Sequence, residues 1–288
     1  MNIRLLETPI ELTAVEELQR LVWPGDDTEI VPVHMLLAIL HGGGLVIGAF
    51  DGDLLVGFVF GFPGANQTLE GHRYWHCSHM AAVHPDYRDT GLGFKLKRAQ
   101  WQMVRRQGFD RITWTYDPLQ SRNANLNISK LGAVCNTYLP NYYGELRDGL
   151  NEGLPSDRFQ VDWWVNSVRV KRRLSKQPRK KLDLAHYLSA ETPRLNETHI
   201  NNQGLITPRP ADPPHSTEIV VPLLLLEIPA DFLTIKALDP DLALEWRLHV
   251  RSFFEKLFAN GYLVTDFVYL SGRQPRSFYV LSHGESTL

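Results

Sequence analysis

The sequence predicts a mixed α+β fold, with strands and helices alternating along the chain. Apolar residues make up 43% of the 288 residues and charged residues 22%, which is typical of a globular protein with a sizeable core. Apolar residues recur at three- and four-residue steps in some segments and alternate with polar residues in others. Glycine and proline separate these segments, as expected of turns between regular elements.

Helices with one apolar face are expected near the amino terminus. Leu12, Val15 and Leu18 recur at helical spacing and predict a helix over 9–22. A second helix is expected over 33–41, where a run of three glycines stops it. In order, we predict a strand over 2–7, these two helices, strands over 45–50 and 54–62 around a tight turn, and a strand over 74–83.

The middle of the chain continues this alternation after a glycine-rich junction. Leu92, Leu96 and Met103 share one face of a helix predicted over 91–107, which Gly108 ends. A strand over 112–116 ends at an Asp-Pro pair, which predicts a turn, and Ser121 is interpreted as the cap of the next helix. That helix is expected over 122–131 and is followed by strands over 134–139 and 159–165.

The carboxy-terminal part begins with a basic segment. Residues 168–181 hold eight basic residues and no acid, and residues 190–217 are rich in Pro, Asn and Thr, as in a linker or a long loop. A strand over 219–228, a long helix that starts at Asp239-Pro240, and strands over 262–269 and 277–281 follow. We therefore predict a first domain over 1–167, a basic segment and linker over 168–217, and a smaller α+β region over 218–288 that packs on the first domain.

The overall charge and the cysteine count indicate where the protein works. The formal net charge is -2, so no general attraction to nucleic acid is expected. The basic segment is interpreted as a solvated helix face, in preference to a grip on nucleic acid or on a phosphate. The presence of only two cysteines indicates a reducing compartment, and no apolar run approaches the ~20 residues that span a bilayer. We predict a cytoplasmic protein that binds neither membrane nor nucleic acid, and we leave a homodimer open.

One segment has the pattern of a phosphate-binding loop. The sequence Arg-Asp-Thr-Gly-Leu-Gly over 88–93 lies between the strand over 74–83 and the next helix. Glycine tolerates positive φ and lets a ligand approach the backbone closely. Amides at a helix start can hold a pyrophosphate, and an arginine can add a charge-assisted hydrogen bond.

This loop, together with Val83-His84-Pro85 before it, resembles the loop of the GNAT acetyltransferase superfamily. The family pattern is Arg or Gln, two residues, Gly, one residue, and Gly or Ala, and the segment over 88–93 fits each position. The expected order of elements agrees over about residues 1–165. The resemblance implies a central, mostly antiparallel sheet flanked by helices, with acetyl-CoA or another acyl-CoA as co-substrate. No metal is expected, because His76 and His79 would point to opposite faces of a strand and no second cluster of ligands stands out. The coenzyme-binding residues that it implies are Ala81, Ala82, Val83, Arg88, Asp89, Thr90, Gly91, Leu92, Gly93, Phe94 and Asn123.

The resemblance also places catalytic residues on the strand over 74–83. In the family, bases lie two to four residues before the stretch that binds pantetheine, where this chain has His79 and Cys77. His79 suits a base because its unperturbed pKa of about 6.5 allows proton transfer at neutral pH, although a histidine satisfied by a neighbour is equally compatible. Cys77 is the second candidate, as a nucleophile or as an inert buried thiol. Strict alternation would place on one face Trp75, Cys77, His79, Ala81 and Val83.

One departure from the family concerns the acid that protonates the leaving thiolate. Family members often have a tyrosine at the position of Ile128 in the helix after the strand over 112–116. Tyr142 is our candidate for a replacement phenol, with Tyr138 and Tyr143 as alternatives from the same stretch. The predicted activity is direct transfer of an acetyl group from acetyl-CoA to an amine of a small molecule. The alternative is a degenerate protein that binds or senses acyl-CoA without turnover.

Overall fold

The computed structural model describes residues 1–25, 29–68, 71–144, 153–175, 181–210 and 221–284. These residues form two compact units, which are described separately. The first unit contains residues 1–114 and 163–167, and the second contains the other described residues.

The first unit is built on a mostly antiparallel sheet. Strands β1 (Asn2–Leu5), β2 (Leu45–Asp51), β3 (Leu54–Thr68) and β4 (Gly71–Val83) pair antiparallel in this order. β5 (Arg111–Tyr116) pairs parallel with β4, and its last two residues belong to the second unit. This architecture, with helices on the sheet, confirms the predicted fold class.

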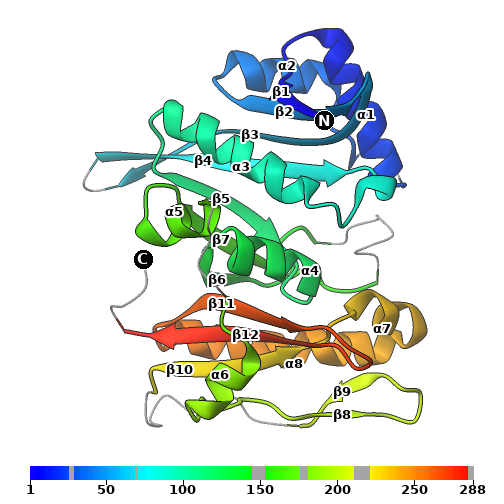
Figure 1. Cartoon of the computed structure of the whole chain (residues 1–288), viewed down its shortest axis with the longest axis vertical. Helices are drawn as coiled ribbons and strands as arrows, with labels where there is room; N and C mark the ends of the chain where they lie inside the picture. Colours follow the sequence, from blue (N-terminus) through cyan, green and yellow to red (C-terminus); the bar gives the residue numbers. More distant parts are fainter. Residues whose placement is uncertain (26–28, 69–70, 145–152, 176–180, 211–220, 285–288) are drawn as a thin grey trace. The chain divides into compact units, whose positions relative to one another are not determined.

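Helices cover both faces of this sheet (Figure 1). α1 (Pro9–Val22) and α2 (Val33–His41) pack on one face through a core that includes Leu12, Leu36 and Phe60. α3 (Leu92–Arg106) packs on the other face, where Leu92 and Leu96 contact the side chains of β2 and β3. The three helices lie where their apolar periodicity predicts them, because burying one apolar stripe is what stabilises a helix in a globular protein.

The β3–β4 hairpin is longer than the strands predicted over 54–62 and 74–83. β3 runs to Thr68 and β4 starts at Gly71. In the extension, Gly64 lies opposite Trp75, and a Cβ on this glycine would come within 2.7 Å of the indole ring. The sequence does not reveal this part of the hairpin because its residues are small or polar and lack apolar alternation.

A β-bulge at His79 changes which side chains of β4 share a face. Met80 and Ser78 lie opposite consecutive residues of β3, which leaves His79 as the extra residue. The predicted common face for His79 and Val83 is therefore wrong. The exposed His79 ring lies against Phe60, a residue of the core on the α1 side, whereas Val83 joins the core on the α3 side. A single extra residue inverts the alternation beyond it.

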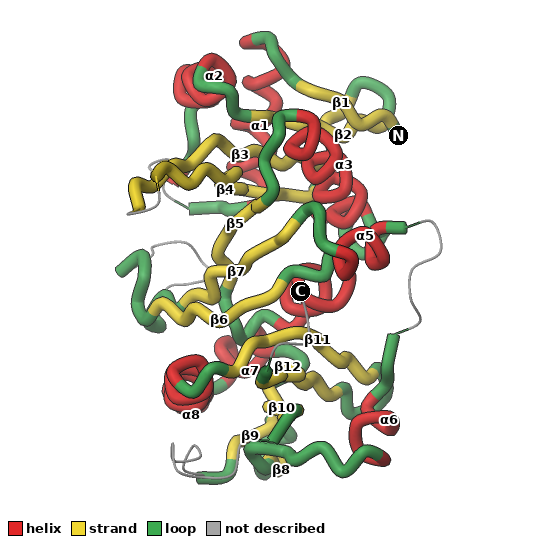
Figure 2. Tube along the Cα trace, turned by 90° about the vertical axis from the view of Figure 1, so that its left-hand side faces the viewer, coloured by secondary structure: helices red, strands yellow, loops and turns green. Residues whose placement is uncertain are grey.

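The second unit contains a further set of antiparallel strands (Figure 2). Its ladder runs from β7 (Arg158–Trp164) to β6 (Val134–Leu139), β11 (Tyr262–Leu270), β12 (Arg276–His283) and β10 (Leu223–Ile228). The last two residues of β7 belong to the first unit. α8 (Pro240–Ala259) packs on β6 and β11, and it buries the predicted apolar stripe, which includes Trp246, Val250 and Phe253.

Shorter helices complete the second unit: α4 (Ser121–Ala124), α5 (Val168–Leu174), α6 (Leu184–Ser189) and α7 (Phe232–Leu238). The helix predicted over 122–131 changes character along its length, because a π-helical turn over Asn125–Lys130 follows α4. Gly132, with a φ of 80°, ends this turn as predicted.

The segment predicted as a linker over 190–217 contains regular structure in its described part, so this prediction is corrected. β8 (Thr198–Ile200) and β9 (Ile206–Pro208) form a hairpin. The buried side chain of Asn196 exchanges hydrogen bonds with the backbone of Glu227. Composition does not distinguish polar side chains that bind backbone from those that face water. Positions 211–217 of the linker, and 219 and 220 of the strand predicted over 219–228, lie outside the described residues.

The basic segment is more than a solvated face, although 176–180 lie outside the described residues. Arg169 donates hydrogen bonds to the carbonyl oxygens of Gly132 and Thr265, and Arg173 pairs with Asp266 at 2.7 Å. These contacts bind α5 to its neighbours in the second unit. The predicted domain borders and the absence of nucleic-acid binding stay predictions. Within the described residues, no helix is both long and apolar enough to cross a membrane.

Candidate active site

The first half of the predicted phosphate loop is held by β2 and β3. His84, the residue after β4, donates its backbone N–H to the carbonyl oxygen of Val56 at 2.9 Å. The hydroxyl of Tyr87 donates to the carboxylate of Asp51 at 2.8 Å. The second half of the loop, residues 88–91, is exposed. The loop therefore combines an anchored base with an accessible tip.

The tip has the backbone geometry of an anion site. Asp89 and Gly91 have positive φ values of 64° and 79°, and Gly91 immediately precedes α3. No side chain caps α3, so the amides of its first turn are not occupied by a cap. Uncapped amides at a helix start, with the exposed Arg88 beside them, suit a pyrophosphate. This geometry fits the coenzyme that the sequence resemblance implies.

One edge of β4 is open next to this loop. In the described ladder β5 pairs with β4 only at His76–Ile112 and Cys77–Thr113. Residues 81–83 pair with β3 along their other edge. Their remaining backbone groups have no strand partner among the described residues, so they can pair with the amides of an extended ligand.

His79 is accessible and suited to accept a proton. The residue is exposed, and its ring lies 5.3 Å from that of Phe60 and 6.0 Å from that of Phe62, measured between centroids. These apolar neighbours remove part of its hydration, and this desolvation lowers the pKa of His79 below its usual value. The imidazole is therefore neutral near pH 7, as a base must be.

Cys77 is less suited to nucleophilic attack. Its side chain is half-buried; burial raises the pKa of the thiol, and the nearby Lys97 ammonium lowers it only in part. A protonated thiol is a weak nucleophile. In the described part of the chain, no hydrogen bond joins Cys77 to His79, and no group of three or more His, Cys, Asp or Glu side chains could hold a metal ion.

A buried polar cluster lies between β4 and α3, and the sequence analysis missed it. Lys97 donates hydrogen bonds to Ser78 at 2.9 Å and to Gln100 at 2.8 Å. The Gln100 amide nitrogen lies 3.2 Å from Nε2 of His76. All four side chains are buried, and we call them the β4–α3 cluster. The available signal is the spacing of Lys97, Gln100 and Val104, which puts two polar residues on the same helix face as a buried valine.

The two remaining predicted site residues belong to the second unit. Asn123 is an exposed residue of α4. Tyr142 is 51% exposed and packs its ring against Tyr143, with centroids 4.7 Å apart. Both side chains are therefore accessible to a ligand, and their roles stay predictions.

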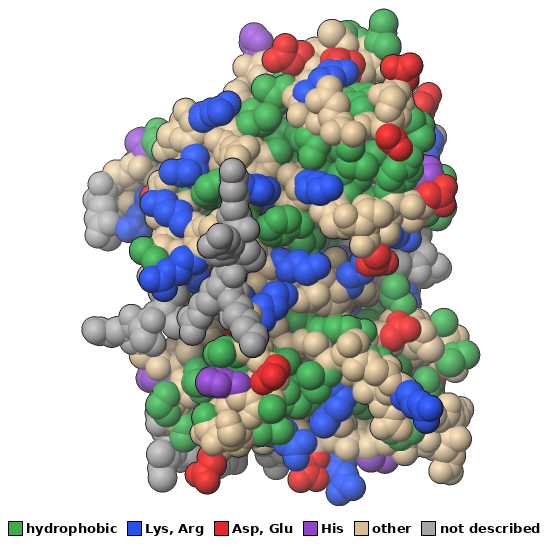
Figure 3. Space-filling view, viewed as in Figure 1, with side chains coloured by type: hydrophobic (Ala, Val, Ile, Leu, Met, Phe, Trp, Pro, Cys, Tyr) green, Lys and Arg blue, Asp and Glu red, His purple; other side chains and the backbone are tan. Residues whose placement is uncertain are grey.

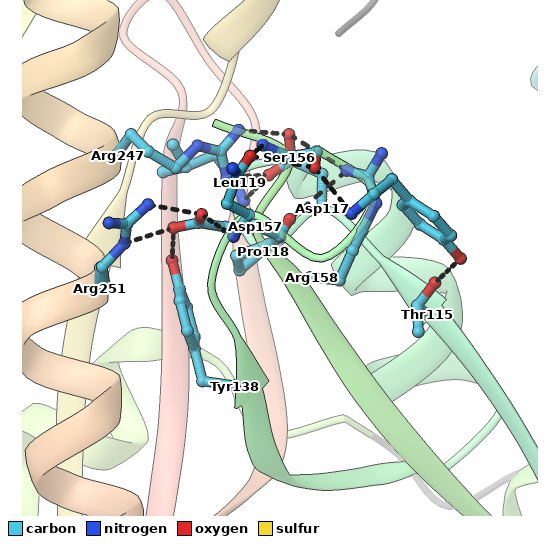
Figure 4. A network of polar contacts seen from close by, with 12 residues as sticks. Thr115, Asp117, Pro118, Leu119, Tyr138, Ser156, Asp157, Arg158, Arg247 and Arg251 are labelled. Atoms are coloured by element: carbon cyan, nitrogen blue, oxygen red, sulfur yellow. Dashed lines mark hydrogen bonds and ion pairs between the residues drawn. The ribbon is translucent and has the colours of Figure 1, made fainter. Parts of the chain in front are cut away.

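A network of buried charges also lies in the second unit (Figure 4). Arg247 of α8 binds Asp117 through hydrogen bonds of 2.7 and 2.6 Å, and Arg251 binds Asp157 through bonds of 2.8 and 2.6 Å. Tyr138 donates to Asp157 at 2.6 Å. Burial raises the pKa of Asp157, but the hydrogen bonds from Arg251, Tyr138 and the amide of Asn141, with the charge of Arg247, together outweigh it and hold this pKa below its usual value. α8 thus neutralises two carboxylates: Asp117, which follows β5, and Asp157, which precedes β7.

This region also decides between interpretations of the sequence. Asp117 forms the expected turn, accepting the amide of Leu119 at 2.9 Å. Ser121 is not a cap: it is the first residue of α4, and its hydroxyl lies 2.7 Å from that of Ser277. The phenol of Tyr138 is committed to Asp157, and burial raises its pKa far above the usual value, so it is a poor proton donor.

Comparison with known proteins agrees with the loop and the fold. Residues 12–127 match the sequence model of the Acetyltransferase (GNAT) family. The chain contains a GNAT acetyltransferase domain. The matched part of this GNAT domain runs from α1 into the π-helical turn, so it includes the predicted phosphate loop, His79 and the β4–α3 cluster. No curated protein matches the chain.

Several solved structures are similar to part of the chain. A type Ii aminoglycoside 6′-acetyltransferase is 20% identical, with 58% of this chain and 99% of that chain covered and a TM-score of 0.46. An aminoglycoside 6′-N-acetyltransferase complexed with coenzyme A is 18% identical, with 58% and 98% covered and a TM-score of 0.43. The ribosomal-protein-S18-alanine N-acetyltransferase from Escherichia coli is 17% identical, with 58% and 94% covered and a TM-score of 0.44.

Proposed function

We propose that the chain is an acyl-CoA-dependent N-acyltransferase that moves an acetyl group from acetyl-CoA to an amine of a small molecule by direct transfer. The observation that carries this proposal is the exposed loop tip, where positive φ at Gly91 leads into the uncapped start of α3 beside the open edge of β4. These features lie together in the part of the chain that matches the GNAT family.

The proposed coenzyme contacts follow from these groups. The first-turn amides of α3 and the side chain of Arg88 would bind the pyrophosphate, and the open edge of residues 81–83 would pair with the pantetheine arm. α3 has no acidic residue, and Lys95, Arg105 and Arg106 on it are exposed. Lys and Arg side chains accordingly lie over α3 on the face shown in Figure 3. This positive field favours approach of an anionic ligand.

The proposed chemistry assigns one proton transfer to each of two residues. Bound acetyl-CoA supplies an acyl group activated as a thioester. His79, neutral near pH 7, would accept the proton of the attacking amine directly or through a water. Tyr142, with its exposed side chain, would donate a proton to the departing thiolate.

A second candidate function is acyl-CoA binding without turnover. Ile128, which stands where family members often have a tyrosine, is fully buried in the second unit. Tyr138 is held by Asp157, which leaves Tyr142 and Tyr143 as the accessible phenols of this stretch. A protein without an acid to protonate the departing thiolate would still bind the coenzyme but would transfer the acyl group much more slowly.

Thermal unfolding with and without excess acetyl-CoA tests the coenzyme site. A ligand that binds only the native state raises the free energy of unfolding by RT ln(1 + [L]/Kd), about 2.7 kcal/mol at 100 times Kd. We expect this shift in the parent protein and its loss in the double variant Arg88→Ala, Gly91→Asp. Arg106→Ala, at the far end of α3, is the matched control and should keep most of it. A folded parent that shows no shift refutes the site.

Release of free thiol in the presence of a panel of small amines tests turnover. Removing a general base typically lowers a rate by about 10²- to 10⁴-fold. We therefore expect His79→Gln to lower kcat within this range while the acetyl-CoA stabilisation stays. Stabilisation without thiol release from any amine would favour the second candidate function.

A further inference from the structure

Lys97 is a buried cation that neither the loop nor the proposed chemistry uses. It is 4% exposed, and its amine lies 3.8 Å from the ring centroid of Trp114 and 5.5 Å from that of Trp163. β4 contributes Ser78, His76 and Cys77 to its surroundings, and α3 contributes the amide of Gln100. Among the described residues no carboxylate pairs with Lys97.

Lys97 is present in both its charged and its neutral form near neutral pH. Burial lowers the pKa of Lys97 to about 7, because the ammonium loses its hydration and gains no carboxylate. Of its two titratable neighbours, His76 stays neutral, since burial and the Lys97 charge lower its pKa to about 3. Burial raises the pKa of Cys77. A nearby charge therefore changes mainly the protonation of Lys97, and not that of His76 or Cys77.

The position of Lys97 connects it to the loop tip. It lies five residues after Leu92, the first residue of α3, which is about 8 Å along a helix that rises 1.5 Å per residue. The first turns of α3 lie between the two positions, and water and salt screen the buried Lys97 end only weakly. An anion held at the start of α3 would therefore stabilise the charged form of Lys97.

We infer that Lys97 is a buried counter-charge for the coenzyme: its protonation and the binding of the coenzyme phosphates at the loop tip favour each other. This inference rests on the proposed function and adds a pH response to the same site. By linkage, the coenzyme binds more tightly when Lys97 is charged, and binding takes up a proton when the pH is above neutral. A coupling of one pKa unit corresponds to a tenfold change in affinity.

Calorimetric titration with coenzyme A at pH 7.5, in two buffers of different ionisation enthalpy, measures this proton uptake. For a shift of one unit from a pKa near 7, the parent takes up about half a proton more than Lys97→Met does. Titration by the phosphates of the coenzyme itself is common to both proteins and cancels in the difference. Across pH 6 to 9, affinity should fall about tenfold more in the parent than in Lys97→Met.

Two controls make the result specific to the buried charge. Lys95→Met removes an exposed lysine two positions nearer the loop tip, and it should weaken binding without changing the number of protons taken up. Lys97→Met should stay folded, because the hydroxyl of Ser78 lies 3.1 Å from Oε1 of Gln100 and can donate to it directly. Circular dichroism checks the fold of each variant.

The outcomes separate this inference from the proposed function. Equal proton uptake by the parent and by Lys97→Met, with both binding coenzyme A, overturns the inference and leaves the coenzyme site intact. A folded parent that binds neither coenzyme A nor acetyl-CoA overturns both. Without ligand, the ¹³Cε signal of Lys97 should titrate near neutral pH, and a midpoint above about 9 contradicts the inference directly.

Discussion

The two units of the chain bury positive charge in opposite ways. In the second unit, Arg247 forms two hydrogen bonds to the carboxylate of Asp117. Burial lowers the pKa of Arg247, but Asp117 together with the nearby Tyr138 and Asp157 raises it by more, so the guanidinium stays charged. In the first unit, the Lys97 amine contacts the hydroxyl of Ser78, the amide of Gln100 and the indole of Trp114, and burial lowers its pKa to about 7. A buried charge with a carboxylate partner is fixed and holds structure together. A buried charge without one can respond to a ligand or to pH.

Removing the carboxylate of Asp117 should produce the largest effect. Asp117→Ala leaves Arg247 buried without its partner, and breaking a buried pair in this way costs about 3–5 kcal/mol. Urea unfolding measures the loss. Glu197→Ala is the matched control in the same unit: it removes an exposed pair with Arg209 and should cost less than about 1 kcal/mol. Equal costs for the two variants would mean that the buried pair of the second unit holds the structure together no better than an exposed pair.

The pH dependence of stability should distinguish Lys97 from the paired arginines. Its folded pKa of about 7 lies below the ~10.4 of an unfolded chain. Between these values the unfolded chain binds more protons, so the free energy of unfolding rises with pH, by about 1.4 kcal/mol per unit of pKa difference. Below pH 7 Lys97 is protonated in both the folded and the unfolded state, so the full cost of burying its charge lowers the free energy of unfolding. Urea unfolding from pH 6 to 10 should show this rise in the parent.

The variant Lys97→Met should lack this rise and should be the more stable protein below pH 7, because it buries no charge. Identical pH profiles for the parent and Lys97→Met would mean that Lys97 keeps a normal pKa. The contrast with the second unit would then be lost.

A smaller effect should follow from Tyr138→Phe, which sharpens the description of the paired network. The variant removes one hydrogen bond to Asp157 and leaves those from Arg251 and from the amide of Asn141. A hydrogen bond to a charged carboxylate contributes about 1.5–3 kcal/mol, which urea unfolding can resolve. A loss well above about 3 kcal/mol would show instead that Tyr138 positions the whole network.

Local patterns predicted much of the fold. α1, α3 and α8 lie at their predicted places because each has an apolar stripe that continues over several turns. The end of the β3–β4 hairpin and the bulge at His79 were missed, because small and polar residues carry no period and one inserted residue leaves no mark on composition. Ser121 was assigned to a cap although it pairs with Ser277, a residue 156 positions away.

The candidate site divides in the same way. The backbone geometry of the loop over 88–93 could be predicted, because it depends on consecutive residues in which Gly91 marks positive φ at a helix start; its role in binding phosphate stays a prediction. Lys97 was missed because a lysine on a basic helix is usually exposed, and the only local sign of its burial is its helical spacing from Gln100 and Val104. The pairing of Arg247 with Asp117 spans 130 positions and has no local signal.

The sequence by itself determined the mixed α/β class, the helices with apolar stripes and the glycine-containing loop that leads into α3, because each depends on residues close together in the chain. Tertiary structure decided which charges are buried and what they meet. It set Arg247 against Asp117 and left Lys97 between Ser78, Gln100 and Trp114. The pKa and the energetic role of a charge depend on its hydration and its neighbours, and these are fixed only when distant segments pack together.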